Sequence, residues 1–360
     1  PILAELWIVN SKLLRKHEKA GDMGAAWLQR NEAGSGGFRL RRYDPAIGFQ
    51  ADRFATHFAG WPAGHVQTTE FRSVLEEASR VLGLLKGEFN TTDGYLPQDQ
   101  IKRLRATGKV KIIEQPSLRT MYFIIMNQRP PLNDVNLRKA LSYAFDYGGF
   151  IDHILSGSVS RNAGIIPANL WGSPPDLKGY TYDLAKAKQH LAQVKAPLRP
   201  LEVGVLAGFG QSEEAAQVLQ AGCAKIGIEI KLNPEPWSVI QGKYNDPNRT
   251  HDLIPLWRSA YFADPHNWTG YLYNSRNIGS GNASFYKNPR VDELTDKALV
   301  LTGQEQRRPL YEEVSRILVE DAAGIYVYNT KYYGPFTDNV KHVRFCPIGD
   351  SQDIRWISFA

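Results

Sequence analysis

The sequence predicts an α/β protein of two lobes, in which the first lobe is discontinuous along the chain. Its 360 residues are more than one hydrophobic core usually spans, so two domains are expected. Two apolar runs, residues 121–126 and 324–329, each lead to an asparagine and lie far apart in the chain. Between them strand patterns alternate with helix patterns, which favours a mostly parallel sheet covered by helices on both faces.

The first crossing between the lobes is predicted just after residues 121–126. This apolar run is rich in aromatic and β-branched residues, as is typical of a strand buried on both faces. Pro130 and Pro131 exclude a helix at the joint, and Asn133 or Asp134 can cap a helix that starts directly afterwards. The apolar side chains of that helix form one stripe at positions 137, 140, 141, 144 and 145.

The second crossing is predicted at residues 324–329, which follow a long helical pattern. With crossings at both points, lobe one comprises residues 1–126 together with 330–360, and lobe two comprises residues 127–329. Within lobe two the periodicities predict strands at 201–205, 228–232 and 253–257, and helices at 183–194, 211–226, 291–301 and 305–322.

Lobe one is predicted to begin with a basic amphipathic helix within residues 1–30. The same pattern also suits a helix that lies on a membrane surface, so both interpretations stay open. Alternating apolar and basic residues predict an exposed strand at 38–43, and a short helix follows Pro97. The alternation within residues 340–359 predicts strands that return to this lobe.

Composition excludes several classes of protein. Hydrophobic residues make up 42% of the chain and aromatic residues 11%, which indicates a globular rather than a disordered protein. The net charge of +6 is spread over the chain, so we expect no nucleic acid partner. Cys223 and Cys346 are too few for a disulfide framework or a structural zinc site, and Cys223 is predicted to be a core residue. No apolar run reaches the roughly 18 residues that span a membrane.

Motifs for catalysis are missing from the sequence. It contains no HExxH, no Walker loop and no Ser-x-x-Lys, and its eight histidines are scattered. Ser35 lies between glycines, but the preceding residues are too polar for the strand that a hydrolase nucleophile requires. We therefore predict that the chain is not an enzyme and that it has no catalytic residues, no metal site and no cofactor.

A dense aromatic segment follows the predicted strand at 253–257. Ligands of open α/β sheets bind beyond the carboxyl ends of the strands, and clefts between domains are common pockets. An ordinary core with a tight Asp-Pro turn is the alternative for most of these rings. The candidate ligand-binding residues are Trp257, Arg258, Tyr261, Phe262, Asp264 and Trp268 in this segment, with Asn127 at the first crossing and Trp171 in a proline-rich loop.

Four segments resemble motifs of one protein family. Residues 120–155, which include PPLNDVNLRKALSYAFDYGGFIDHILSG, resemble the most characteristic block of the oligopeptide and dipeptide solute-binding proteins of bacterial ABC importers. These are family 5 of the extracellular solute-binding proteins. Residues 31–43, 84–90 and 182–194 are similar to further motifs of the family in the same order. The resemblance covers essentially the whole chain, although the family's N-terminal segment is not represented in it.

The resemblance implies the two-lobed periplasmic binding protein fold of type II, the Venus flytrap. It also implies an exported, periplasmic protein that captures a small organic solute or peptide in the cleft between its lobes and delivers it to the membrane subunits of an ABC permease. No signal peptide is visible in the sequence, and the N-terminal part of lobe one is expected to be missing from it. We expect a monomer.

One position departs from the pattern of the peptide-binding members. They carry an aspartate, which holds the peptide's ammonium group, three residues before the acid of an acidic-Pro pair. That pair is matched here by Asp264 and Pro265, and the aspartate is replaced by Tyr261. A tyrosine cannot neutralise a buried ammonium group. We therefore predict a ligand without a free amine: an anionic or aromatic solute, an opine-like conjugate, or a sugar-containing compound.

Arg258 is the candidate clamp for a carboxylate or phosphate of such a ligand, unless it is paired with a nearby acid. Other interpretations stay open. The chain could bind true dipeptides or oligopeptides if Asp264 replaces the missing aspartate. It could also be a hydrolytic enzyme, or a peptide-binding chaperone that works without a transporter. Haem and metal chelates are bound within this family too, and His266 lies beside the aromatic segment.

Overall fold

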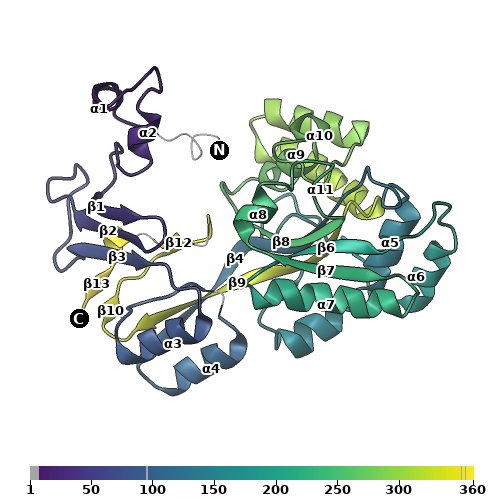
Figure 1. The fold of residues 1–360 in the computed structure, drawn as a ribbon, viewed down its shortest axis with the longest axis horizontal. Helices are drawn as coiled ribbons and strands as arrows, with labels where there is room; N and C mark the ends of the chain where they lie inside the picture. Colours follow the sequence, from purple (N-terminus) through teal and green to yellow (C-terminus); the bar gives the residue numbers. More distant parts are fainter. Residues whose placement is uncertain (1–7, 95, 350, 353) are drawn as a thin grey trace. The chain divides into compact units, whose positions relative to one another are not determined.

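A computed structural model describes the chain except for residues 1–7, 95, 350 and 353. The chain forms two compact units (Figure 1). The first unit contains the residues up to 114, with 333–346 and 351–360, and the second contains 115–332 and 347–350. The first unit is therefore discontinuous along the chain.

The units divide at 114 and 332, whereas the predicted lobe boundaries lie at 126 and 329. The difference arises from β4 (Val110–Ile125), which is longer than the predicted strand. Its residues 120–125 pair with β8 (Leu253–Arg258), so this part of β4 belongs to the second unit. The strand β9 (Gly324–Thr337) likewise continues eight residues beyond the predicted strand end and has residues in both units.

The second unit is built on a six-stranded sheet with the order β5-β9-β4-β8-β6-β7. Strand β6 runs parallel to β7 and β8, while β4 is antiparallel to β8 and β5 is antiparallel to β9. The expectation of a mostly parallel sheet is therefore wrong, and the sheet is mixed. The remaining strands of the sheet are β5 (Ser160–Arg161), β6 (Leu201–Leu206) and β7 (Ile230–Glu235).

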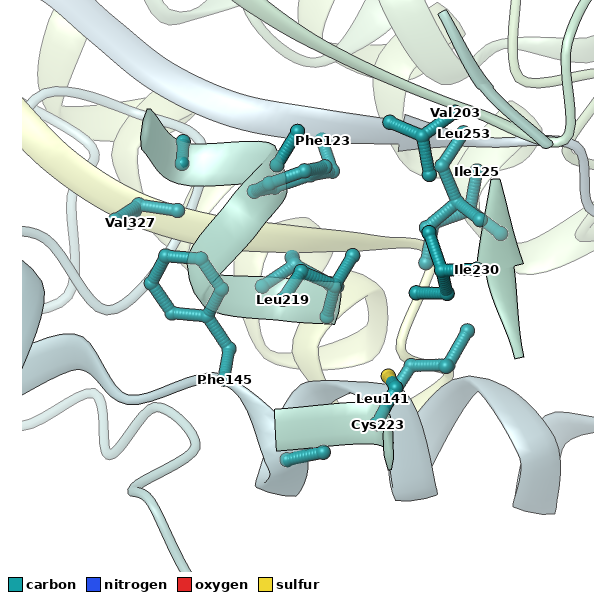
Figure 2. Packing of buried hydrophobic residues seen from close by; sticks show 14 of the residues in the cluster. Phe123, Ile125, Leu141, Phe145, Val203, Leu219, Cys223, Ile230, Leu253 and Val327 are labelled. Carbon is teal, nitrogen blue, oxygen red and sulfur yellow. The ribbon is translucent and has the colours of Figure 1, made fainter. Parts of the chain in front are cut away.

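Both faces of this sheet carry a hydrophobic core, which explains the continuous apolar run in β4. Phe123 and Ile125 contribute to one core, together with residues of α5 (Val135–Ala144) and α7 (Gly210–Ala224) (Figure 2). Tyr122 and Ile124, which alternate with them along the strand, contribute to the other core. The prediction of a strand buried on both faces is confirmed.

Helices cover the two faces of the sheet. Figure 1 shows α7 along one side, with α9 (Gly270–Tyr273), α10 (Pro289–Val300) and α11 (Gln304–Glu320) on the other. The predicted cap of α5 is confirmed, because Oδ1 of Asp134 accepts a hydrogen bond of 2.8 Å from the Asn136 N–H. Cys223 is fully buried in the core shown in Figure 2, as predicted, and burial raises the pKa of its thiol. The other α-helices of this unit are α6 (Leu184–Leu191) and α8 (Trp237–Gln241).

The first unit contains the three-stranded antiparallel sheet β1-β2-β3. The predicted strand at 38–43 corresponds to β1 (Phe38–Asp44), which is followed by β2 (Gly48–Arg53) and β3 (Thr68–Arg72). The helices are α1 (Ser11–Lys16), α2 (Ala25–Leu28), α3 (Glu77–Lys86) and α4 (Gln98–Ala106). Short strands near the C-terminus are β10 (Val340–Lys341), β11 (Phe345–Cys346), β12 (Ser351–Gln352) and β13 (Ser358–Phe359).

The long amphipathic helix predicted within residues 1–30 is reduced to α1 and α2 in the described residues. Its first apolar positions, such as Leu3 and Trp7, lie outside that part of the chain. The helix α1 begins after Asn10, whose side chain accepts a hydrogen bond of 3.0 Å from the Leu13 N–H. Among the described helices, none has the length and apolar character needed to cross a membrane.

Candidate ligand-binding site

The candidate residues gather at the carboxyl end of β8, where neighbouring residues have different environments. Trp257 lies opposite Met121 of β4, and Arg258 lies opposite Thr120. Successive side chains of a strand point to opposite faces of the sheet. Trp257 and Arg258 therefore make separate sets of contacts, and the single cluster expected from the sequence is divided into two.

Trp257 is half-buried and linked to residues far away in the sequence. Its Nε1–H donates a hydrogen bond of 3.0 Å to the hydroxyl of Tyr328, which donates one of 2.8 Å to Oε1 of Gln211. The Arg119 guanidinium carbon lies 5.3 Å from the centroid of the Trp257 ring, and the Phe209 ring lies 6.3 Å from it. This face of the strand thus combines a fixed indole ring with a cation, which suits an aromatic or anionic group.

Arg258 lies between two tyrosine rings on the other side. Its guanidinium carbon is 4.5 Å from the ring centroid of Tyr261 and 4.6 Å from that of Tyr271. Its Nη2 donates to Oδ1 of Asn267 at 2.8 Å, and its Nε donates to the Asn267 carbonyl at 3.2 Å. Burial lowers the pKa of Arg258, because it disfavours the charged form.

Arg258 forms no ion pair with any carboxylate of the described residues. The alternative that a nearby acid neutralises it therefore has no support in this part of the chain. A largely desolvated guanidinium group with only amide, carbonyl and ring neighbours is suited to bind a carboxylate or phosphate of a ligand. The two flanking tyrosines remain accessible, since Tyr261 is 49% exposed and Tyr271 is 42% exposed.

Asp264 forms a buried ion pair within the protein. Its two carboxylate oxygens accept hydrogen bonds of 2.5 and 2.9 Å from the Arg307 guanidinium group of α11, and both side chains are buried. Phe262 is half-buried in the same loop, and its carbonyl accepts the Asp264 N–H. Asp264 could hold a ligand's ammonium group only if this buried ion pair were broken.

His266 is enclosed beside that ion pair. Burial lowers its pKa to about 4, so its imidazole is neutral near pH 7. Its Nδ1 lies 3.4 Å from the hydroxyl of Tyr311. No group of three or more potential metal ligands occurs among the residues that the structure describes. His266 therefore has the environment of a structural histidine.

The contacts of the remaining candidates, Trp268, Asn127 and Trp171, stabilise the fold. Trp268 is fully buried in the second core. Asn127 is buried and donates from Nδ2 to the carbonyls of Ile125 and Ala323, which links the end of β4 to the start of β9. Trp171 packs beside Arg307, whose guanidinium carbon lies 5.2 Å from the Trp171 ring centroid.

Several neighbours of the site were not among the sequence candidates: Arg119, Phe209, Gln211, Tyr271 and Tyr328. Tyr271 is one of the rings of the same aromatic segment and could have been included among the candidates. The other four come from β4, the β6–α7 loop, α7 and β9, and the packing of these elements brings them near Trp257. No local sequence pattern marks them.

Comparison with known proteins identifies the family. The sequence profile of the bacterial extracellular solute-binding proteins, family 5 (middle region), matches residues 2–280. The chain belongs to this family. It is similar to the probable D,D-dipeptide-binding periplasmic protein of Escherichia coli strain K12, with 32% identity over 95% of this chain and 65% of the relative. It is also 26% identical to heme-binding protein A of Haemophilus influenzae, over 69% of this chain and 46% of that protein.

Solved structures of family 5 proteins show the same fold. The periplasmic binding protein of Helicobacter pylori in complex with the peptide STSA superposes with a TM-score of 0.90, at 21% identity, over 100% of this chain and 70% of that one. A Campylobacter jejuni protein in complex with Ni(L-His) gives a TM-score of 0.85 at 15% identity, over 97% of this chain and 72% of that one. The predicted family and the two-lobed periplasmic binding protein fold are therefore confirmed. The chain spans less than two thirds of the length of the curated relatives described above.

Proposed function

We propose that the chain is the solute-binding component of an ABC importer, exported to the periplasm, and that it delivers a small organic solute to the permease subunits. Membership of family 5 carries this proposal, since the relatives are named as binding proteins rather than enzymes. No covalent chemistry is needed. A solute that binds one conformation more tightly shifts the population toward that conformation, which the permease would recognise. The protein acts as a monomer and has no nucleic acid partner.

The ligand that we propose is an anionic solute held by Arg258 and not by a carboxylate. The observation that supports it is the Arg258 guanidinium group, which lies between Tyr261 and Tyr271 without a carboxylate partner among the described residues. Tyr261 replaces the residue that would neutralise a peptide's ammonium group, and Asp264 is already paired with Arg307. Opine-like conjugates and other acids with a blocked or absent amine fit this arrangement.

A dipeptide or oligopeptide is the second candidate ligand. The similarity to the probable D,D-dipeptide-binding protein favours it. A peptide's carboxylate could bind Arg258 in the same way, and only its ammonium group would lack a partner. The two candidate ligands therefore differ in whether they carry a free amine, whereas both carry an acidic group that can bind Arg258.

Native mass spectrometry of the purified protein tests the proposal, because it retains a bound solute and reports its mass. An acid without a free amine that is released on denaturation would support the anionic ligand, and a peptide mass would contradict it. Calorimetry should then show that the identified solute binds at least about tenfold more weakly to Arg258→Gln, since a charge-assisted pair is lost. Arg249→Gln, at an exposed position of the same unit, is the matched control. Co-purification with permease subunits separates an importer component from a chaperone without a transporter.

A further inference from the structure

The first unit contains a cavity of about 500 Å³ that the proposed function does not use. The residues that line it are Pro62, Ala63, His65, His342, Val343, Arg344 and Trp356. All of these residues belong to the first unit. The volume lies within the range of roughly 300–1,000 Å³ that is typical of small-molecule sites.

The charge of the lining residues favours an anion. Arg344 is exposed at the open side of the cavity and supplies a positive charge, and its guanidinium carbon lies 3.6 Å from the centroid of the Trp356 ring. This cation–π contact holds the guanidinium group against the indole and leaves N–H groups free to point away from the ring. The described residues that line the cavity include no aspartate or glutamate. A carboxylate ligand would therefore meet an attractive group and no repulsive one in this lining.

The two histidines of the cavity are held in position. His65 is 8% exposed, and its Nδ1–H donates a hydrogen bond of 3.0 Å to the Ala63 carbonyl. Its Nε2 is buried and has no hydrogen-bond partner in the part of the chain that the structure describes. His342 has a backbone φ of 57°, in the left-handed region that residues other than glycine rarely adopt. Its Nδ1 lies 2.8 Å from the hydroxyl oxygen of Ser358.

A buried polar atom without a hydrogen-bond partner costs free energy, and so does backbone strain, which concentrates at ligand sites in proteins. A bound ligand would explain why both features occur in the lining of one cavity, beside a guanidinium group and an indole. We propose that this cavity is a binding site for a small planar carboxylate of the size of a single-ring aromatic acid. The carboxylate binds Arg344, and the ring packs on the wall formed by Pro62, Val343 and Trp356. The proposal does not depend on the importer function.

Benzoate is the probe for the test, with benzamide as its uncharged counterpart of the same shape. In protein labelled with ¹⁵N-tryptophan, benzoate should shift the indole N–H resonance of Trp356 in a saturable manner. The resonance is assigned by its loss in Trp356→Phe. Benzamide should bind at least about tenfold more weakly, because it lacks the charge that pairs with Arg344. The Trp257 resonance in the same spectrum reports on the other site.

A variant of Arg344 and a matched control test the residue that binds the carboxylate. Arg344→Gln should weaken benzoate binding at least about tenfold, whereas Arg103→Gln, at an exposed position of α4 in the same unit, should not. The proposal is wrong if benzoate leaves the Trp356 resonance unchanged, if benzamide binds equally well, or if Arg344→Gln has no effect.

Discussion

Asp264 and Arg307 form a buried, bidentate ion pair that ties the loop after β8 to the helix α11. The two oxygen–nitrogen distances are 2.5 and 2.9 Å, and Arg307 also donates to the Tyr311 hydroxyl at 2.7 Å. Asp264 begins the short helical turn Pro265–Asn267 by accepting a hydrogen bond of 3.0 Å from the His266 N–H. The pair therefore holds in place the loop that carries the rings beside Arg258.

Removing one member of this pair should strongly destabilise the second unit. Arg307→Ala leaves the Asp264 carboxylate buried without its cation, and such a change typically costs about 3–5 kcal/mol. Arg308→Ala is the matched control, because Arg308 lies on the same helix and pairs with Glu305 at the surface. The control should cost less than about 1 kcal/mol. Urea unfolding followed by circular dichroism measures both, and equal effects would contradict the structural role of the pair.

His266 should make the stability of the protein depend on pH. Its pKa is about 4 in the folded state and 6.5 in the unfolded state, so the unfolded state binds the proton more tightly. His266 should therefore have no effect on the free energy of unfolding above pH 6.5. As the pH drops from 6.5 toward 4, the free energy of unfolding should fall by up to about 3 kcal/mol. Urea unfolding at pH 7.0 and 5.0 measures this loss.

In His266→Gln the difference in stability between pH 7.0 and 5.0 should be clearly smaller. His153→Gln, at an exposed position of the same unit, should leave it unchanged. If His266→Gln keeps the full pH dependence, another group causes it.

The helices and strands of the second unit could be predicted from the sequence better than the pairing of its strands. The runs at 121–126 and 253–257 are apolar enough to be recognised as buried strands. Asp134 caps α5, and Asp183 caps α6. The order of strands depends on pairing between distant segments, so the mixed sheet could not be deduced from periodicity. The longer β4 follows from the same pairing, because local composition does not show that the strand begins at Val110.

The side-chain contacts of the candidate site could likewise be predicted from the sequence only in part. The separation of Trp257 from Arg258 follows from the twofold period of a strand and could have been predicted. The pairing of Asp264 with Arg307 could not, because the two residues are 43 positions apart and no motif connects them. The contact between Trp257 and Gln211 through Tyr328 likewise requires three elements to be packed together.

Gly222 should be required for the close packing of α7 on α5. A Cβ atom at this position would lie 1.8 Å from the carbonyl oxygen of Ala144, which is a backbone atom that cannot rotate away. Gly222→Ala should therefore destabilise the protein by at least about 1–3 kcal/mol. Gly210→Ala in the same helix is the control, since no atom lies within 4 Å of its added methyl group. The control should be neutral or stabilising by up to about 1 kcal/mol, and equal losses would contradict the argument.

The hydroxyl of Tyr328 should determine the orientation of both Trp257 and Gln211. Tyr328→Phe removes the acceptor of the Trp257 Nε1–H and the donor to Gln211 Oε1, and the loss should cost about 1–3 kcal/mol. The indole N–H resonance of Trp257 should shift upfield in ¹⁵N-tryptophan spectra, because its hydrogen bond is lost. Tyr147→Phe is the matched control, because Tyr147 is also buried and donates only to the Ser142 carbonyl in the hydrogen bonds of the described residues. That variant should lower stability without moving the Trp257 resonance. An unchanged resonance in Tyr328→Phe would show that the Trp257 ring is held by packing alone.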